Sequence, residues 1–498
     1  MKQFKILFYV VLLTGVVTST SCKKFSYYQT NPNEPTEADP SLELTNIEQT
    51  AFATITTEAA LACRQLIYTE SADVSQYYGW SRSDFSPYVN IQQVVKMEQE
   101  ATRTSQLNYY YIGKFLTDYY IVNLTQTFGS VPFSQALQAM YGNVSEAAIA
   151  PAYDTQEQIY IQVLKDLETA NDSLSTANGT ISGDVIYNGN ITQWKEAINS
   201  FALRVLMSLS LKTGDANLQV VQKFNNIFSN PTQYPLFASN ADNAELPYYN
   251  LAGNYYPYYN NNSIKTDFYM DSSFVHMLRG FNDPRLFTFA NPTTASGLPA
   301  GNFAAYAGLQ GSAPLSDNVA AVTAGQASAI NNRYAYDPVN EPSVLMGYAE
   351  LQFTLAEAVI RGWITGSANT YYMNGVQAAL EFSNYGDTSY TSSEIQTYLA
   401  QPAIQLTAAN QLQQVLTQKY ISMFMNTGWE PFYNQRRTGI PVFETSGAGI
   451  LNNGVIPVRW MYPTTEYQTN PVNVDSAVAA QYPNGDNING VMWILQPQ

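Results

Sequence analysis

Residues 154–174 read DTQEQIYIQVLKDLETANDSL, and their pattern decides the fold class. Apolar side chains recur at spacings of three and four, while most charged residues fall on the other side of the predicted helix. The residues that share the apolar face are Tyr160, Val163, Leu164, Leu167 and Leu174. Asp154 followed by Glu157 has the spacing of a capping box that begins a helix. Such an amphipathic helix must pack on a neighbour to bury its apolar face.

A second helix is predicted from Thr192 onward, with Gly214 as its stop. Its apolar positions, again three and four apart, are Trp194, Ile198, Phe201, Val205 and Leu209. The same periodicity predicts helices at about 45–70, 101–128, 343–362, 370–384 and 407–426. Consecutive helices of this kind form hairpins that stack into a superhelix. We therefore predict an all-α fold with little β structure.

Two parts of the chain lack this periodicity. Residues 229–342 are rich in Asn, Pro, Gly, Ser and Tyr, which predicts a long irregular insertion with short helices. From Thr427 to the end, glycines and prolines punctuate the chain again, so residues 427–498 are expected to form a mostly irregular cap. Loops carried on a helical scaffold often hold the binding site.

The N-terminus has the features of a processing signal. Lys2 and Lys5 precede an apolar run from Ile6 to Val17, which is shorter than the roughly 20 residues that a membrane span needs. The small residues before Cys22 resemble the lipobox of bacterial lipoproteins, although Ser19 is less typical there than leucine. We predict a lipoprotein signal peptide over residues 1–21, acylation (palmitate) of Cys22, and an anchor with an extended linker over residues 22–45.

The composition excludes several classes of function. Removal of residues 1–21 takes away two lysines and no acidic residue, so the net charge changes from −16 to −18. Nucleic acid is not an expected partner, because its binding relies on cationic side chains. The single histidine, His276, lies in an apolar helix-like stretch and is expected to be a partly buried structural residue, so neither a metal site nor a Ser-His-acid triad is predicted. No cofactor motif is present, and a glycosidase pair of carboxylates stays open.

Motifs along nearly the whole chain resemble those of the SusD/RagB-like outer-membrane lipoproteins of Bacteroidetes, in the branch called SusD-like family two. The matching segments are NPNEPT (31–36), TFGSVPF (127–133), YDTQE (153–157), DPRL (283–286), YAELQF (348–353), RRTG (436–439) after Trp429-Glu430, and IPVR (456–459) before Glu466. Ser130 and Phe133 replace the aspartate and tyrosine of the family pattern. We interpret these motifs as scaffold, with Arg436, Arg437 and Glu466 as candidates for buried ion pairs.

This resemblance implies a tetratricopeptide-like superhelix, here a single domain over residues 46–498. It also implies a binding protein, not an enzyme, on the extracellular face of the outer membrane, where it would act as a lid on a SusC-like TonB-dependent transporter. The 38 tyrosines suit carbohydrate, since an aromatic ring has an apolar face for a sugar ring. Glycan is therefore the expected cargo. Peptide cargo is the alternative, and a surface glycosidase is the less favoured third reading.

Two segments are candidates for the ligand site. The first follows the first predicted helix and offers a stacking ring with polar neighbours: Tyr77, Tyr78, Trp80, Arg82, Asp84 and Asn90. The second lies in the loop-rich insertion, where so many rings cannot easily all be buried: Tyr255, Tyr256, Tyr258, Tyr259 and Asn260. Trp80 is the candidate ring for stacking on the ligand; the alternative is that Trp80 is buried under its loop, in which case the second segment is the candidate site.

The proposed anchor can be tested by replacing Cys22 with alanine. Acylation needs the thiol, so Cys22→Ala is expected to release the protein from the outer membrane. Carbonate extraction of membranes from cells that express the wild type or the variant measures the anchored fraction. A variant that stays in the membrane pellet and is still cleaved by protease on intact cells would contradict the anchor.

Overall fold

The computed structural model describes residues 37–498 except 143–144 and 386–388. The predicted signal peptide and Cys22 lie outside the described residues. The described chain contains 20 α-helices and four short strands, so the predicted all-α fold with little β structure is confirmed. Among the described residues, no helix is both long and apolar enough to cross a membrane.

The helices, in chain order, are α3 Pro40–Ala51, α4 Thr57–Ala62, α5 Pro87–Thr104, α6 Leu107–Phe128, α7 Glu146–Ile149, α8 Gln156–Ser173, α9 Ile191–Ser208, α10 Val220–Ser229, α11 Asn262–Thr266, α12 Ser272–Gly280, α13 Arg285–Phe289, α14 Leu315–Thr323, α15 Arg333–Tyr336, α16 Tyr348–Ile360, α17 Ala368–Phe382, α18 Ser392–Leu399, α19 Gln411–Ser422, α20 Glu430–Thr438, α21 Thr464–Thr469 and α22 Pro471–Gln481. The strands are β1 Leu66–Tyr68, β2 Ala244–Leu246, β3 Phe268–Met270 and β4 Ser343–Met346. They form two separate antiparallel pairs, β1 with β3 and β2 with β4.

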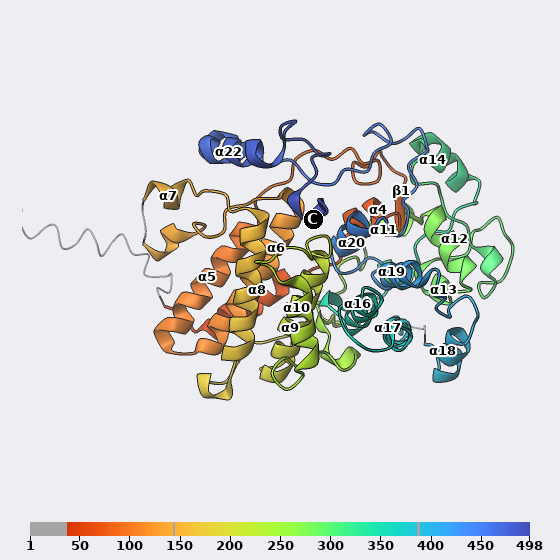
Figure 1. The fold of residues 1–498 in the computed structure, drawn as a ribbon. Coiled ribbons are helices and arrows are strands. Elements are labelled where there is room, and N and C mark those ends of the chain that lie inside the picture. The colour runs from red at the N-terminus through yellow and green to blue at the C-terminus, as the bar shows by residue number, and fades with distance from the viewer. Residues whose placement is uncertain (1–36, 143–144, 386–388) are drawn as a thin grey trace, which may run out of the picture.

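Long helices packed in pairs form the scaffold. Helices α5, α6, α8 and α9 lie side by side, each in contact with the next, and α16 packs on both α17 and α19 (Figure 1). Helix α8 buries the apolar face that the sequence predicts, with the Tyr160 and Val163 side chains fully enclosed. Its capping box differs by one position: Thr155 and Gln158 cap each other's backbone, while Asp154 accepts hydrogen bonds from the 133–134 backbone.

Several predicted helix boundaries are wrong for local reasons. The helix expected at 45–70 is two helices, α3 and α4, followed by β1. The helix expected at 101–128 is the end of α5 followed by α6, because Ser105 adopts a left-handed conformation that ends α5. Helix α9 ends at Ser208, before the predicted stop at Gly214. Such boundaries depend on single backbone angles, which the apolar spacing does not report.

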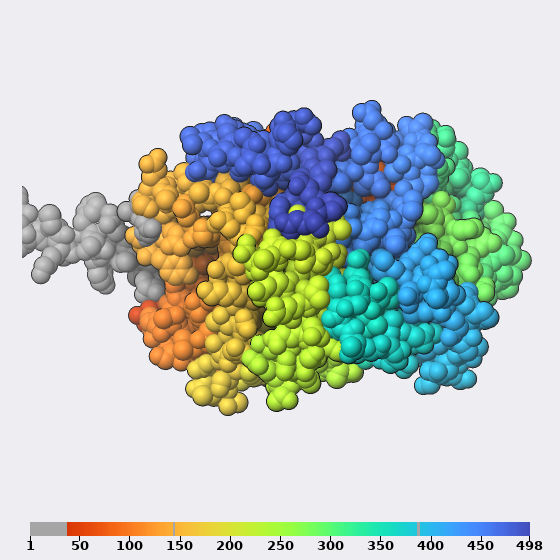
Figure 2. Space-filling view, in the orientation of Figure 1, coloured from red at the N-terminus to blue at the C-terminus, as the bar shows by residue number. Residues whose placement is uncertain are grey.

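The C-terminal cap contains more helix than the sequence predicts. Helices α20, α21 and α22 lie within residues 427–498, and a proline in the first turn helps to begin both α20 and α22. In Figure 2 this segment, in blue, covers the upper side of the molecule. Gly129 ends α6 with a φ of +95° and leaves room for Tyr482, whose hydroxyl donates to the Phe128 carbonyl at 2.7 Å. The cap is therefore bonded directly to the end of a scaffold helix.

Two glutamates of α16 hold buried cations from three other helices. Glu350 forms a two-pronged ion pair with Arg204 of α9, and its Oε1 lies 3.6 Å from Lys419 Nζ of α19. Glu357, two turns later, accepts from Arg437 Nη1 of α20 at 2.7 Å and from Arg361 Nε at 2.8 Å. Arg437 is thus in a buried ion pair, but its partner is Glu357 and not Glu466.

The remaining members of the predicted ion-pair group have other contacts. Arg436 Nη1 donates to the carbonyls of Gln126 and Val458 at 2.9 and 2.7 Å. Glu466 accepts a hydrogen bond of 2.7 Å from the Tyr153 hydroxyl. Both residues join the C-terminal cap to the scaffold, so the predicted role in fixing loops onto helices holds for them without an ion pair.

Acid should weaken the fold through Glu357. Burial favours the neutral carboxyl, but Arg437 and Arg361 outweigh it and lower the pKa of Glu357 to about 2. A depressed pKa stabilises the fold above the unfolded-state pKa of about 4.3, and this contribution, about 3 kcal/mol, is lost as the pH falls toward 2. Glu357→Gln should remove that pH dependence and also lower the free energy of unfolding by about 3–5 kcal/mol at neutral pH, since Arg437 loses a buried partner.

Urea titrations of both proteins at about pH 7 and about pH 3 measure these differences. The exposed Asp475→Asn serves as the control, because it removes a carboxylate from the surface of α22. An unchanged pH slope in Glu357→Gln would contradict the assigned role.

Candidate functional site

The rings of the first predicted segment are core residues. Tyr77 and Tyr78 are buried, and Trp80 is only 5% exposed. The Trp80 ring stacks on Trp460 with centroids 4.8 Å apart, and its indole N–H donates to the Arg459 carbonyl at 3.1 Å. Trp80 is therefore a core residue, which is the second of the two alternatives for this ring, and Tyr77 and Tyr78 are corrected to core residues with it, because neighbouring side chains already cover their faces.

The polar residues of the same segment have separate roles. Arg82 forms an ion pair of 2.9 Å with Asp486 and also donates to the Tyr462 carbonyl, so it holds the C-terminal cap. Asp84 is exposed, and its Oδ1 accepts from the Ser86 backbone at 2.9 Å just before α5. Asn90 lies beside Tyr120: burial raises the pKa of Tyr120, and the Asn90 side chain opposes part of that rise.

The second predicted segment is divided between core and surface. Tyr256 is buried against Tyr334 and Tyr258, so it too is corrected to a core residue. Tyr258 is half-buried and its hydroxyl accepts from the Thr57 backbone at 2.9 Å. Tyr255 is 37% exposed and packs on half-buried Tyr259, with centroids 4.9 Å apart. Asn260 is exposed in a left-handed conformation that favours asparagine.

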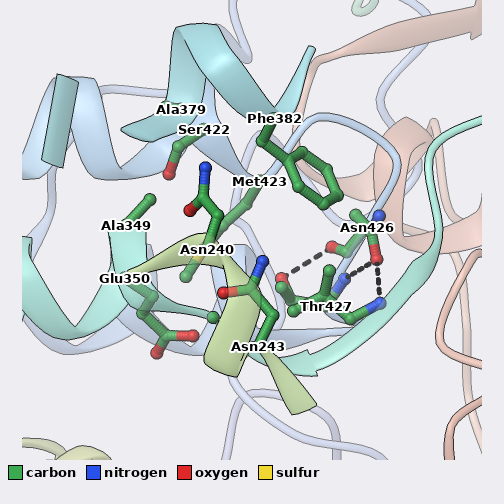
Figure 3. Close-up of a pocket in the computed structure, with 12 residues that line it drawn as sticks. Asn240, Asn243, Ala349, Glu350, Ala379, Phe382, Ser422, Met423, Asn426 and Thr427 are labelled. Carbon is green, nitrogen blue, oxygen red and sulfur yellow. Dashed lines mark hydrogen bonds between the residues drawn. The ribbon is translucent and has the colours of Figure 1, made fainter. Parts of the chain in front are cut away.

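One cavity is too small for a nutrient ligand. It lies between α16, α17 and the end of α19, with a volume of about 30 Å³ (Figure 3). Asn426, at its edge, accepts from the Val344 backbone at 2.9 Å and donates to the Pro342 carbonyl at 2.8 Å. This volume suits one or two water molecules. The Asn426 contacts join the chain after α19 to β4, and we interpret the cavity as structural.

A much larger cavity, of about 330 Å³, lies between α6 and α20, and we call it the α6–α20 cavity. Four further segments reach it: the end of α3 with the residues after it, the turn before α5, α9 through Arg204, and residues 427–429. Its aromatic walls are Tyr119, Tyr120, Phe128, Trp429 and Tyr433. Its neutral polar groups include Thr54, Thr56, Ser83, Ser86, Asn123 and Thr127. This combination of rings and uncharged hydrogen-bonding groups fits a polar organic ligand with apolar faces.

Trp429, and not Trp80, presents an aromatic ring to the α6–α20 cavity. It is half-buried and lines the α6–α20 cavity, while its ring packs edge-on against Trp460 at 4.7 Å and against Trp80 at 6.1 Å. The buried Trp80 and Trp460 rings therefore fix the orientation of Trp429. A ring held this way loses little conformational freedom when a ligand stacks on it.

The charged groups of the cavity are fixed by the scaffold. Arg204 is held by Glu350, so its charge is already balanced. Burial and the nearby Glu350 raise the pKa of Glu430, while the Asn434 amide donates to Glu430 Oε1 at 2.8 Å. Burial raises the pKa of Tyr433 to about 12, and its hydroxyl lies 3.2 Å from Thr127 Oγ1. Apart from Arg204, Glu430 and Asp84, the side chains that line the cavity are uncharged.

Sequence reasoning missed most of this cavity because its walls come from distant segments. The sequence pattern indicated Asp84 as a candidate, and it predicted a scaffold role for the motifs that contain Phe128 and Trp429. The signal available in the sequence was Trp429 itself, a large aromatic residue just before α20. Only the tertiary contacts show that its ring lines the cavity and that the Trp80 ring does not.

His276 and Cys63 are not among the residues that line the two cavities described above. His276 is exposed on α12, which corrects the prediction of a partly buried imidazole. Cys63 is a free, buried thiol whose pKa is raised by burial. Within residues 37–498, apart from the two gaps, no three His, Cys, Asp or Glu residues are grouped to hold a metal ion.

Comparison with known proteins gives a consistent set of relatives. Residues 32–463 match the SusD-like_2 family model, described as starch-binding and associating with the outer membrane. A solved outer-membrane protein of Bacteroides vulgatus, thought to take part in nutrient binding, is 35% identical, with 92% of this chain and 100% of that chain covered and a TM-score of 0.85. A SusD homologue of Bacteroides fragilis is 38% identical over 93% of this chain and 100% of that chain, with a TM-score of 0.83.

A chitin-binding protein is 25% identical over 91% of this chain and 98% of that chain, with a TM-score of 0.74. Among curated proteins, no match was found.

The structural role of Trp80 predicts a large loss of stability on truncation. Trp80→Ala is expected to lower the free energy of unfolding by about 3–5 kcal/mol, because it leaves a void among Tyr78, Phe432 and Trp460. Urea unfolding followed by circular dichroism measures the change. Tyr255→Ala on the surface should cost about 0.5 kcal/mol or less. Equal stabilities for Trp80→Ala and the wild type would show that Trp80 is not a core residue.

Proposed function

The chain belongs to the SusD-like family of starch- and nutrient-binding outer-membrane proteins, and on this basis we propose that it captures oligosaccharide in the α6–α20 cavity and delivers it to a SusC-like TonB-dependent transporter. The proposed location is the extracellular face of the outer membrane, with Cys22 as the lipid anchor. The observation that carries the choice of cavity is its size together with its lining. It is about eleven times the volume of the cavity in Figure 3, and its lining includes both aromatic rings and hydroxyl groups.

The cavity's chemistry supports carbohydrate as cargo. The exposed part of Trp429 offers an apolar surface to the C–H face of a sugar ring, and Asn123 and Thr127 offer directional hydrogen bonds to its hydroxyl groups. The chitin-binding relative supports the same class of ligand. Peptide remains the alternative cargo, since amide groups and side chains would use the same donors and rings.

Binding without chemical change is the proposed activity. The family is one of binding proteins. The two carboxyl groups of the cavity, Asp84 and Glu430, both have local structural roles: Asp84 bonds the turn before α5, and Glu430 bonds Asn434 within α20. These contacts support a fixed binding surface over a glycosidase.

Replacement of the cavity ring tests the proposal. Trp429→Ala should weaken binding of an oligosaccharide by about 1–3 kcal/mol, roughly 5- to 150-fold in Kd, because a fixed stacking surface is lost. Isothermal titration calorimetry with chitin, starch and neutral peptide fragments measures binding and identifies the cargo class. Asn123→Ala on the facing wall should weaken binding without disturbing the tryptophan cluster, which separates ligand contact from altered packing.

Tyr255→Ala is the matched control, since it removes an exposed ring outside the cavity. A loss of binding in Tyr255→Ala, with Trp429→Ala and Asn123→Ala unaffected, would transfer the site to the 255–260 loop. Cleavage of the oligosaccharide by rigorously purified protein would contradict the proposal of binding alone.

A further inference from the structure

A second large cavity, of about 220 Å³, lies on the other side of α6, and we call it the acidic cavity. Helices α5, α6 and α8 and residues 133–141 enclose it. Its carboxyl groups come from three different helices: Glu98 from α5, Asp118 from α6 and Asp166 from α8. It shares none of its lining residues with the α6–α20 cavity.

The carboxyl groups of the acidic cavity are not all paired with a cation. Lys114 is the one cation among its lining residues, and its Nζ lies 3.1 Å from Asp166 Oδ1. Asp166 is also bonded through its second oxygen, which accepts from Gln162 at 2.9 Å. Lys114 and Asp166 thus neutralise each other. Glu98 and Asp118 have no cationic partner of their own within the described part of the chain.

Asp118 is the group whose bonding is incomplete. Its side chain lines the cavity but is only 1% exposed, and its Oδ2 has no hydrogen-bond partner among the described residues. The neighbouring Thr117 hydroxyl lines the same cavity and likewise has no partner there. A buried carboxyl oxygen without a hydrogen bond lowers the stability of the fold by about 1–3 kcal/mol or more, so its presence calls for an explanation such as a ligand that this oxygen binds.

The position of Glu98 is fixed by the helix that faces it. Gly113 of α6 has no side chain, and a Cβ at that position would lie 2.9 Å from Glu98 Oε1 and 2.8 Å from its Cγ. The Tyr141 hydroxyl donates to the other carboxyl oxygen at 3.4 Å. Glu98 therefore lies against α6 at Gly113, the residue before Lys114 and more than one turn before Asp118. The lining also has an apolar part, formed by Ile91, Val95, Ile121, Phe133 and Leu137.

We propose that the acidic cavity is a second ligand site, which binds the primary ammonium group of a small amine of monosaccharide size between Glu98 and Asp118. A –NH3⁺ group has three donors, which match the free oxygen of Asp118, the Glu98 carboxylate and the Thr117 hydroxyl. The apolar wall accommodates the carbon skeleton of the amine. An amino sugar has both parts. The site is distinct from the α6–α20 cavity, so it stands whether or not that cavity binds oligosaccharide.

Protonation links the site to pH. Burial raises the pKa of Glu98 to about 7, and burial together with Asp166 raises the pKa of Asp118 well above its usual value. An ammonium ion stabilises the ionised carboxylates, so its binding expels protons from them. Four other titratable groups line the same cavity: Tyr88 of α5, Lys114 of α6, Asp166 of α8, and Tyr141 from residues 133–141. Affinity should accordingly rise with pH as long as the amine remains protonated.

Calorimetry of the full mature protein with glucosamine and glucose tests the proposal. The two sugars differ only by –NH3⁺ in place of –OH, so glucosamine should bind with proton release and glucose should not bind at the acidic cavity. Proton release is measured by repeating the titration in buffers of different ionisation enthalpy. Equal binding of glucose, or no binding of glucosamine between about pH 5.5 and about pH 7, would overturn the proposal.

Variants locate the binding in the cavity. Asp118→Asn and Glu98→Gln should each weaken glucosamine binding by about 10- to 100-fold and reduce the proton release, since each removes a charge-assisted hydrogen bond. Both variants keep the side-chain shape, and circular dichroism and thermal midpoints check that they fold. Asp475→Asn, an exposed carboxylate on α22, is the matched control and should bind like the wild type. Unchanged glucosamine affinity in Asp118→Asn would refute the site.

Oligosaccharide binding to the α6–α20 cavity is measured in parallel on the same variants. It should be unaffected by Asp118→Asn, and glucosamine binding should be unaffected by Trp429→Ala. This pair of results distinguishes a failure of the second site from a failure of the proposed function.

Discussion

Glu350 and Glu357 of α16 each neutralise cations that the fold places in its interior, and the positions of α9, α19 and α20 depend on these contacts. A buried guanidinium without a carboxylate partner is strongly destabilising, so the four helices cannot move apart independently. Arg204, held by Glu350, also lines the α6–α20 cavity. The same ionic contacts that order the scaffold therefore fix one wall of the proposed binding site. The rigidity of that wall lowers the entropic cost of ligand binding.

The cluster of Trp80, Trp429, Phe432 and Trp460 connects the scaffold to the C-terminal cap. Trp80 comes from the loop before α5 and the other three rings come from residues 427–498, and Arg82 adds a bond from the same loop to Asp486 of the cap. The loop before α5 is consequently held at two points, by the ring contacts of Trp80 and by the Arg82–Asp486 ion pair. The Trp80 ring is covered by the other rings of this cluster, and its contact with Trp429 helps to orient the Trp429 ring toward the cavity. One tryptophan is thus structural, and its neighbour is available to a ligand.

The two large cavities lie on either side of α6 and differ in electrostatics. The α6–α20 cavity has neutral polar groups, and its arginine is already paired, which suits an uncharged ligand. The acidic cavity has an apolar part and two carboxyls that form no ion pair within the residues that the structure describes, which suits a cation with a carbon skeleton. Different residues of α6 line the two cavities: Tyr119 and Asn123 line the α6–α20 cavity, and Lys114 and Asp118 line the acidic cavity. A single long helix can therefore serve two ligand chemistries.

The sequence by itself determined the helices, the loop-rich insertion and the resemblance to a family, because apolar spacing and short motifs are local properties of the chain. Periodicity identified α8 and α9 and the residues that they bury, such as Tyr160 and Trp194. It did not determine whether Trp80 or Trp429 is covered, since burial depends on which distant segments pack on a ring. It missed α22 because that helix has a weakly amphipathic pattern and begins at Pro471. The α6–α20 cavity was decided only by tertiary structure, because helices from opposite ends of the chain meet there and the space between them exists only once the buried ion pairs of α16 hold them in place.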